Sequence, residues 1–288
     1  MRRWTLALPI IGLMLLFAGA ARADQVTLWD TLAPNPALAI TAQGNAAIPS
    51  EAADDFFYLD PVAFRVDEIR VQGLLTDPNA AIRGVKVEVY QTFPFDSNTR
   101  RTPVTTRANG PADNEFVSLD SSRRGELAFA VRDVGPFTVD HVITPGSEKQ
   151  EGALEAGLTG DLREIAIRLN GRPLILLPAR AAQPTQLNHY FLSVTVETSS
   201  GDYYWVAGQR PPFVFPGSGD RQAWLRTDPF DPDWRRVSDV INNSDGTGAP
   251  AFNTSFRISG QPLPITVALV ERTAVEMTRF IRAVVGAP

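Results

Sequence analysis

The sequence ADDFFYLDPVAFRVDEIRVQGLL, residues 53–75, decides the fold class of this chain. Apolar and polar residues alternate along its second half, and the parity of the apolar positions changes between Val66 and Ile69, at the polar pair 67–68. Strict alternation is typical of a half-buried β-strand, and a change of parity at two polar residues is typical of a bulge. The stretch therefore predicts a bulged strand with one face on a core.

The next segment predicts a second strand beside it. Its apolar and polar faces alternate residue by residue, with Val85, Val87 and Val89 against Lys86, Glu88 and Tyr90. Roughly ten short runs of this kind, without intervening helices, predict an all-β fold. We expect an antiparallel β-sandwich or jelly-roll-like single domain over residues 24–260, with long loops and a short C-terminal helix.

The clearest pair of runs lies late in the chain. Residues 190–197 alternate in polarity, residues 199–202 have the composition of a turn, and residues 203–206 resume a strand pattern. This arrangement predicts a β-hairpin. The alternation also assigns Val194 to the core and Thr195 to the opposite, outer face.

The N-terminal segment predicts export. Arg2 and Arg3 precede an apolar run that ends in Ala21-Arg22-Ala23, which is the pattern of a cleaved signal peptide over residues 1–23. The alternative is an uncleaved anchor. After cleavage we expect no transmembrane segment and a location outside the cell, at its surface or in the periplasm. Residues 261–288 are expected to form a tail with a short helix over residues 273–285.

Composition excludes several classes of function. The chain of 288 residues has a net charge of −5, which argues against nucleic acid as a partner. It contains no cysteine, so disulfides, thiolate metal sites and a cysteine nucleophile are excluded. The common nucleophile-elbow, zinc-protease and phosphate-loop motifs are missing, and the two histidines, His141 and His189, belong to different predicted elements.

Aromatic residues gather late in the chain and suggest a ligand-binding surface. Consecutive residues 203–205 on one strand must point to both of its faces, so one large ring is expected to leave the core. Exposed flat rings stack on the apolar faces of sugars. The candidate glycan-binding residues are Tyr203, Trp205, Trp224 and Trp234. The alternative is that these rings pack beneath the proline-rich loop 209–219.

Three aspartates suggest a metal site. Asp228, Asp231 and Asp233 are spaced by prolines that stiffen the loop, and carboxylate oxygens are the ligands that Ca²⁺ prefers. A structural calcium ion is therefore a candidate cofactor. The alternative is that these aspartates cap turns and protect sheet edges.

Several short motifs resemble those of one known family. They are residues 53–56, 87–90, 93–97, 101–107, 189–191, 200–203, 224–226, 232–234 and 252–256. In this order they are similar to an uncharacterised group of exported bacterial β-sandwich proteins, many of which end in a PEP-CTERM sorting signal. The resemblance implies the same fold and export. The residues after Gly260 show no clear sorting signal, so the resemblance does not imply that mode of anchoring here.

Two functions follow from these patterns. The first is an exported, non-catalytic module with a role at the cell surface or in the extracellular matrix, binding an extracellular polysaccharide or another surface component. The alternative is a secreted, glycosidase-like hydrolase that uses two carboxylates. Two acidic side chains converging in a cleft would favour the hydrolase, and aromatic rings on an open face would favour the binding module.

Overall fold

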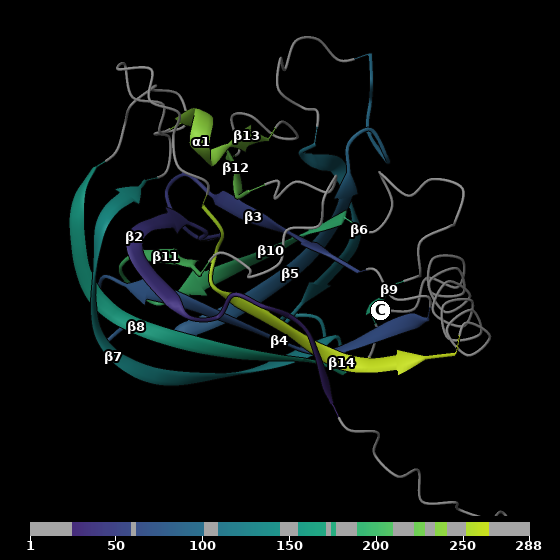
Figure 1. The fold of residues 1–288 in the computed structure, drawn as a ribbon. Helices are drawn as coiled ribbons and strands as arrows, with labels where there is room; N and C mark the ends of the chain where they lie inside the picture. Colours follow the sequence, from purple (N-terminus) through teal and green to yellow (C-terminus); the bar gives the residue numbers. More distant parts are fainter. Residues whose placement is uncertain are drawn as a thin grey trace, which may run out of the picture.

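The computed structural model describes residues 25–58, 62–100, 109–144, 155–170, 174–176, 189–209, 222–227, 234–240 and 252–264. In this part the chain is nearly all β, with two curled sheets and one single-turn helix, α1 (Val237–Val240), as Figure 1 shows. The predicted all-β class is confirmed. The signal peptide expected over residues 1–23 and the helix expected over residues 273–285 lie outside the described residues.

The first sheet, sheet A, has eight strands, five of which form a closed ring of pairings. Its order is β1 (Val26–Asp30), β14 (Phe256–Leu263), β4 (Ala63–Leu75), β11 (Tyr203–Gly208), β2 (Pro34–Thr41), β7 (Leu127–Ile143) and β8 (Glu155–Leu169), with β9 (Leu174–Leu176) also on β4. Strand β8 pairs with β4 as well as with β7, so β4, β11, β2, β7 and β8 form a closed circuit of pairing.

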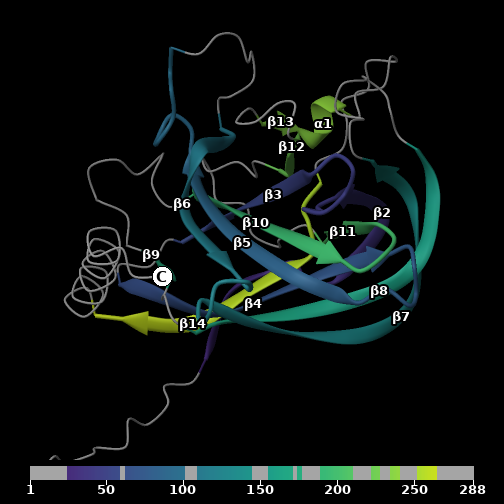
Figure 2. The same cartoon turned by 180° about the vertical axis from the view of Figure 1, so that it is seen from behind.

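The second sheet, sheet B, has six strands. Its order is β13 (Arg235–Arg236), β12 (Trp224–Thr227), β3 (Ser50–Phe57), β10 (His189–Thr198), β5 (Ile82–Thr92) and β6 (Pro111–Asp120). Figures 1 and 2 show it from opposite sides, lying across the curve formed by β4, β7 and β8. One face of sheet B therefore meets sheet A, and the other face is free to carry polar side chains.

The main core lies between the two sheets. It contains Ile69 and Val71 of β4 in sheet A together with the valines of β5 in sheet B, all with almost no exposed surface. A smaller apolar cluster, which includes Leu74, Leu162 and Tyr204, receives side chains from all five strands of the closed circuit. Strand β11 and the second half of β2, which contribute to both clusters, are thus buried on both faces.

The bulge predicted in β4 is present. Ser259 of β14 pairs with Glu68, and the next residue, Gly260, pairs with Val66, so Asp67 is the extra residue. A Cβ atom on Gly260 would lie 1.9 Å from the carbonyl oxygen of Arg65. Only glycine lets the two backbones approach this closely where the strand bends.

The predicted hairpin over residues 190–206 is wrong in its pairing. Strand β10 lies in sheet B between β3 and β5, whereas β11 lies in sheet A between β2 and β4. The turn therefore carries the chain from one sheet to the other. It packs on the loop between β4 and β5, which also crosses between the sheets: Ser200 Oγ donates to Asp77 Oδ2 at 2.5 Å, and Asp202 N donates to Thr76 Oγ1 at 2.8 Å.

Other differences from the sequence prediction concern sheet A. Strand β2 pairs in parallel with β7 through Ala39 and Ile40, whereas the other pairings between named strands in the described part of the chain are antiparallel. Leu38 and Ile40 face the main core and Ala39 faces the smaller cluster, so this part of β2 is buried on both faces. It therefore lacks the alternation of apolar and polar residues by which a strand is predicted. In the described part of the chain, no helix has the length and apolar character needed to cross a membrane.

Candidate functional site on the outer face of sheet B

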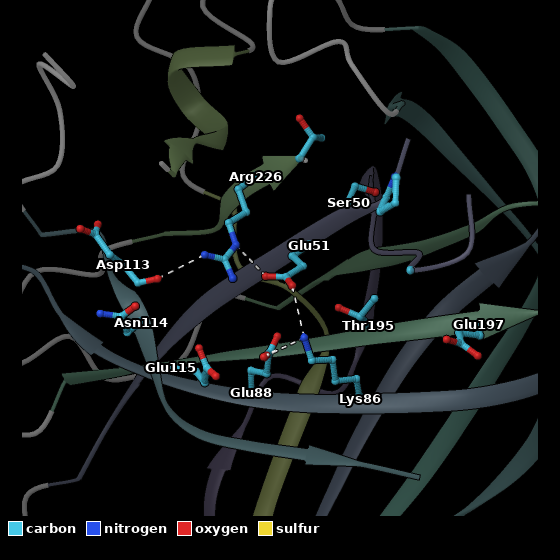
Figure 3. A pocket seen from close by; sticks show the side chains of 13 residues that line it. Ser50, Glu51, Lys86, Glu88, Asp113, Asn114, Glu115, Thr195, Glu197 and Arg226 are labelled. Atoms are coloured by element: carbon cyan, nitrogen blue, oxygen red, sulfur yellow. Dashed lines mark hydrogen bonds and ion pairs between the residues drawn. The ribbon is translucent and has the colours of Figure 1, made fainter. Parts of the chain in front are cut away.

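A polar pocket of about 580 Å³ lies on the face of sheet B that points away from the core. Side chains alternate along strands, so residues between the core positions of β3, β5, β10 and β12 point outward together. They include Glu51, Lys86, Glu88, Thr195 and Arg226, which Figure 3 shows around one hollow. These four strands and β6, which adds Asp113, Asn114 and Glu115, thus build the pocket.

Arg226 is fixed at one side of the pocket, and only 9% of its surface is exposed. Its register partner on β3 is Glu51, and its Nε donates to Glu51 Oε2 at 2.7 Å. Its Nη2 donates to the Tyr90 hydroxyl at 2.6 Å, and that hydroxyl donates in turn to Glu51 Oε2 at 3.3 Å. The guanidinium also lies 4.5 Å from the centre of the Trp234 ring, a cation–π distance. These contacts leave Arg226 little freedom to move.

Lys86 lies between two carboxylates. Its Nζ is 2.8 Å from Glu88 Oε1 and 3.8 Å from Glu51 Oε1. Burial alone would lower the pKa of Lys86, but the hydrogen bond that Lys86 donates to Glu88 and the charges of Glu88 and Glu51 outweigh burial and raise it. Lys86 is therefore an ammonium ion at neutral pH.

Glu88 is the most deeply buried carboxylate of the pocket, with 3% of its surface exposed. Burial raises its pKa above the ordinary 4.5, and repulsion from Glu51 raises it further, against the opposing pull of Lys86 and Arg226. Its Oε1 is bound by Lys86, but its Oε2 has no hydrogen-bond partner among the described residues. A buried acceptor in a pocket that lacks a donor is a candidate ligand contact.

Two hydroxyl groups beside Glu88 are also buried without a hydrogen-bond partner among the described residues. Ser193 pairs across the strands with Glu88, and Thr195 pairs with Lys86. Both side chains are more than nine-tenths buried, and within the described part of the chain neither hydroxyl has a hydrogen-bond partner. An unsatisfied buried polar group costs about 1–3 kcal/mol. Of these two residues, Thr195 lines the pocket, so Glu88 Oε2 and Thr195 Oγ1 are the buried groups that a polar ligand in the pocket would stabilise.

The four aromatic candidates from the sequence are all buried. Tyr203 and Trp205 lie in the main core, and their neighbour Tyr204 faces the smaller cluster because sheet A curls around that side of β11. Trp224 and Trp234 pack together with Tyr90 on the outer face of sheet B, next to Arg226. In this structure none of the four presents an open ring face to solvent.

The calcium candidates Asp228, Asp231 and Asp233 lie outside the described residues. In the part that is described, there is no group of three or more acidic or histidine side chains placed to hold a metal ion. The two histidines are far apart in the fold: His141 is exposed on β7, and His189 is buried on β10 with its Nδ1 3.4 Å from Asp55 Oδ2.

The sequence did not identify the charged residues of the pocket as a site. Glu88 and Lys86 were visible as the polar face of a strand, a position normally assigned to solvent. Glu51 and Arg226 belong to short segments with no distinctive pattern, and only the pairing of β12 with β3 brings them together. The clearest signal of a site in the sequence was the polar strand face formed by Lys86 and Glu88, which continues into the aromatic residue Tyr90.

Comparisons with known proteins give no match: no family model, no curated protein and no solved structure is similar to this chain. The resemblance to exported bacterial β-sandwich proteins stays a prediction.

Proposed function

We propose that this chain is an exported, non-catalytic module that binds a glycan in the pocket on the outer face of sheet B, with a role at the cell surface or in the extracellular matrix. In this proposal the two curled sheets are a variant of the β-sandwich or jelly roll. The observation that carries it is the pocket floor, where Glu88 Oε2 and the hydroxyl of Thr195 are buried without hydrogen-bond partners among the described residues.

Sugars suit such a floor. Each sugar hydroxyl both donates and accepts a hydrogen bond, so neighbouring hydroxyls can donate to a carboxylate oxygen and exchange hydrogen bonds with a threonine. The receiving groups, Glu88 and Thr195, stand on neighbouring strands of one sheet, and Lys86 fixes the Glu88 carboxylate through Oε1. A rigid arrangement lowers the entropic cost of binding.

The alternative function, a carboxylate-dependent hydrolase, has one observation in its favour. Glu88, with its raised pKa, has the character of a general acid, and Glu51 is a second carboxylate close enough to shift that pKa. Against this role, Lys86 Nζ lies 2.8 Å from Glu88 Oε1 and 3.8 Å from Glu51 Oε1, so its positive charge opposes the proton that a general acid must carry. Binding without turnover fits the arrangement better.

Isothermal titration of the purified protein against a panel of oligosaccharides tests the proposal. Thr195→Val keeps the shape of the side chain and removes one hydroxyl from the pocket, so it should weaken binding by roughly three- to tenfold. Thr138→Val, the same change at an exposed position of β7, should leave the affinity unchanged.

Two outcomes would contradict the binding module. One is the absence of binding to any member of the panel. The other is an increase in reducing ends during incubation that disappears in Glu88→Gln, which would identify a hydrolase instead.

A further inference from the structure

The pocket carries an excess of negative charge. Its lining contains two basic side chains, Lys86 and Arg226, and five acidic ones, Glu51, Glu88, Asp113, Glu115 and Glu197. Both basic groups are engaged by the protein itself, because Arg226 binds Glu51 and Tyr90, and Lys86 binds Glu88. A ligand entering the pocket therefore meets a field that attracts cations and repels anions.

Two of the carboxylates mark the rim. Glu115 and Glu197 are exposed, and Figure 3 shows them on opposite sides of the pair formed by Lys86 and Glu88. Neither forms an ion pair within the described part of the chain. A positive ligand group would reduce the repulsion among these side chains, whereas an acidic ligand would increase it.

The buried end of the pocket provides the specific contact. Glu88 Oε2 and Thr195 Oγ1 are both buried, both lack partners among the described residues, and belong to neighbouring strands. An ammonium group has three hydrogens to donate and needs acceptors around it. A carboxylate oxygen and a threonine hydroxyl provide two such acceptors, and sugar hydroxyls next to the ammonium can use the remaining polar groups of the lining.

From this arrangement we infer that the pocket selects a sugar that carries a free ammonium group, as in a de-N-acetylated amino-sugar polymer, over neutral and acidic sugars. This inference rests on the proposed glycan-binding function and specifies its ligand class. The ammonium group lies against Glu88 Oε2, and the rim carboxylates Glu115 and Glu197 provide long-range attraction. Acidic sugars are excluded by the same charges.

The test compares three tetramers by isothermal titration: glucosamine, N-acetylglucosamine and galacturonic acid, at a pH that is low enough to protonate the sugar amine and still above the raised pKa of Glu88. The glucosamine tetramer should bind about tenfold more tightly than its acetylated form, which corresponds to one charge-assisted hydrogen bond. The galacturonate tetramer should bind least. Spermidine, which has ammonium groups without sugar hydroxyls, should bind more weakly than the glucosamine tetramer.

Matched variants locate the effect. Glu88→Gln keeps the shape of the side chain and should remove most of the preference for the free amine. Glu115→Gln, at an exposed position where folding is not at risk, should reduce that preference about twofold to threefold, as expected for one exposed charge near a charged ligand. Asp140→Asn removes one charge from an exposed position of β7, outside the pocket, and should change nothing.

The possible failures are distinguishable. Equal or tighter binding of the acetylated tetramer overturns the ammonium selectivity and leaves glycan binding as such in place. Equal binding of spermidine shows that the pocket binds amines without recognising the sugar, which overturns the selection of an amino sugar. Absence of binding by all three tetramers overturns the proposed function itself. An unchanged preference in both Glu88→Gln and Glu115→Gln overturns the assignment to this pocket.

Discussion

Glu88 makes the stability of the fold depend on pH in an unusual direction. Its pKa in the folded chain is raised above the ordinary 4.5, first by burial and then by Glu51, while Lys86 and Arg226 oppose the shift. A proton on Glu88 therefore favours the folded state. This stabilisation is complete below pH 4.5 and is lost as the pH rises through the raised pKa.

Glu88→Gln should remove this dependence. As the pH falls from neutral to about 4.5, the wild type should gain free energy of unfolding relative to the variant, because only the wild type binds a proton more tightly when folded. Urea denaturation of both proteins at a series of pH values measures the difference.

Glu164 on β8 provides a control with the opposite sign. Burial opposes its ionisation, but hydrogen bonds from Arg132, Gln72 and Arg70 prevail and lower its pKa. Its contribution is present above pH 4.5 and is lost as the pH falls through the lowered pKa. If Glu88→Gln and Glu164→Gln gave differences of the same sign, the account of Glu88 would be wrong.

Strand β10 shows what an alternating pattern reveals and what it does not. The alternation of residues 190–197 correctly separates the core face from the opposite face, because Val194 lies in the main core and Thr195 does not. It does not reveal that the opposite face is also buried, beneath the pocket, nor that β10 pairs with β3 and β5 instead of β11. A period of two reports the orientation of side chains, whereas pairing depends on strands distant in the sequence.

Reciprocal substitutions on β10 test this description. Val194→Thr places a hydroxyl in the apolar core and should lower the free energy of unfolding by about 1–3 kcal/mol. Thr195→Val has the same steric size and removes a hydroxyl that has no partner among the described residues, so it should leave stability equal or raise it by up to about 1 kcal/mol. Denaturant midpoints of the two variants measure the contrast, and equal losses at both positions would contradict it.

At the scale of the whole molecule, the sequence was informative about class and poor at topology. The bulge in β4 and the core valines of β5 were predictable because they depend on local alternation. The closed circuit of sheet A and the parallel contact of β2 with β7 were not, because they join segments about a hundred residues apart. The pocket was missed for the same reason: Glu51, Glu88 and Arg226 meet only after four strands, β12, β3, β10 and β5, pair in sheet B.

A core shared by both sheets predicts that they unfold together. Ile167 of β8 and Val87 of β5 belong to the same buried cluster, although they lie in different sheets. Truncation of either to alanine, Ile167→Ala or Val87→Ala, should lower the free energy of unfolding by about 2–4 kcal/mol. In each variant the denaturation midpoints measured by far-UV circular dichroism and by tryptophan fluorescence should shift together, because the two sheets share one core. Fluorescence reports on both sheets, since Trp205 lies in sheet A and Trp224 lies in sheet B.

Val131→Ala provides the matched control for this pair, since Val131 is 42% exposed on β7 and its truncation should cost less than about 0.5 kcal/mol. A variant that separated the two probes into distinct transitions would show that each sheet is stable without the other. The main core would then be an interface between two units, and the pocket on sheet B would persist after sheet A had unfolded. We expect coincident transitions instead. The chain crosses from sheet A to sheet B between β4 and β5, and from sheet B to sheet A between β10 and β11. These two crossings are hydrogen-bonded to each other, so the sheets are connected covalently at two adjacent places.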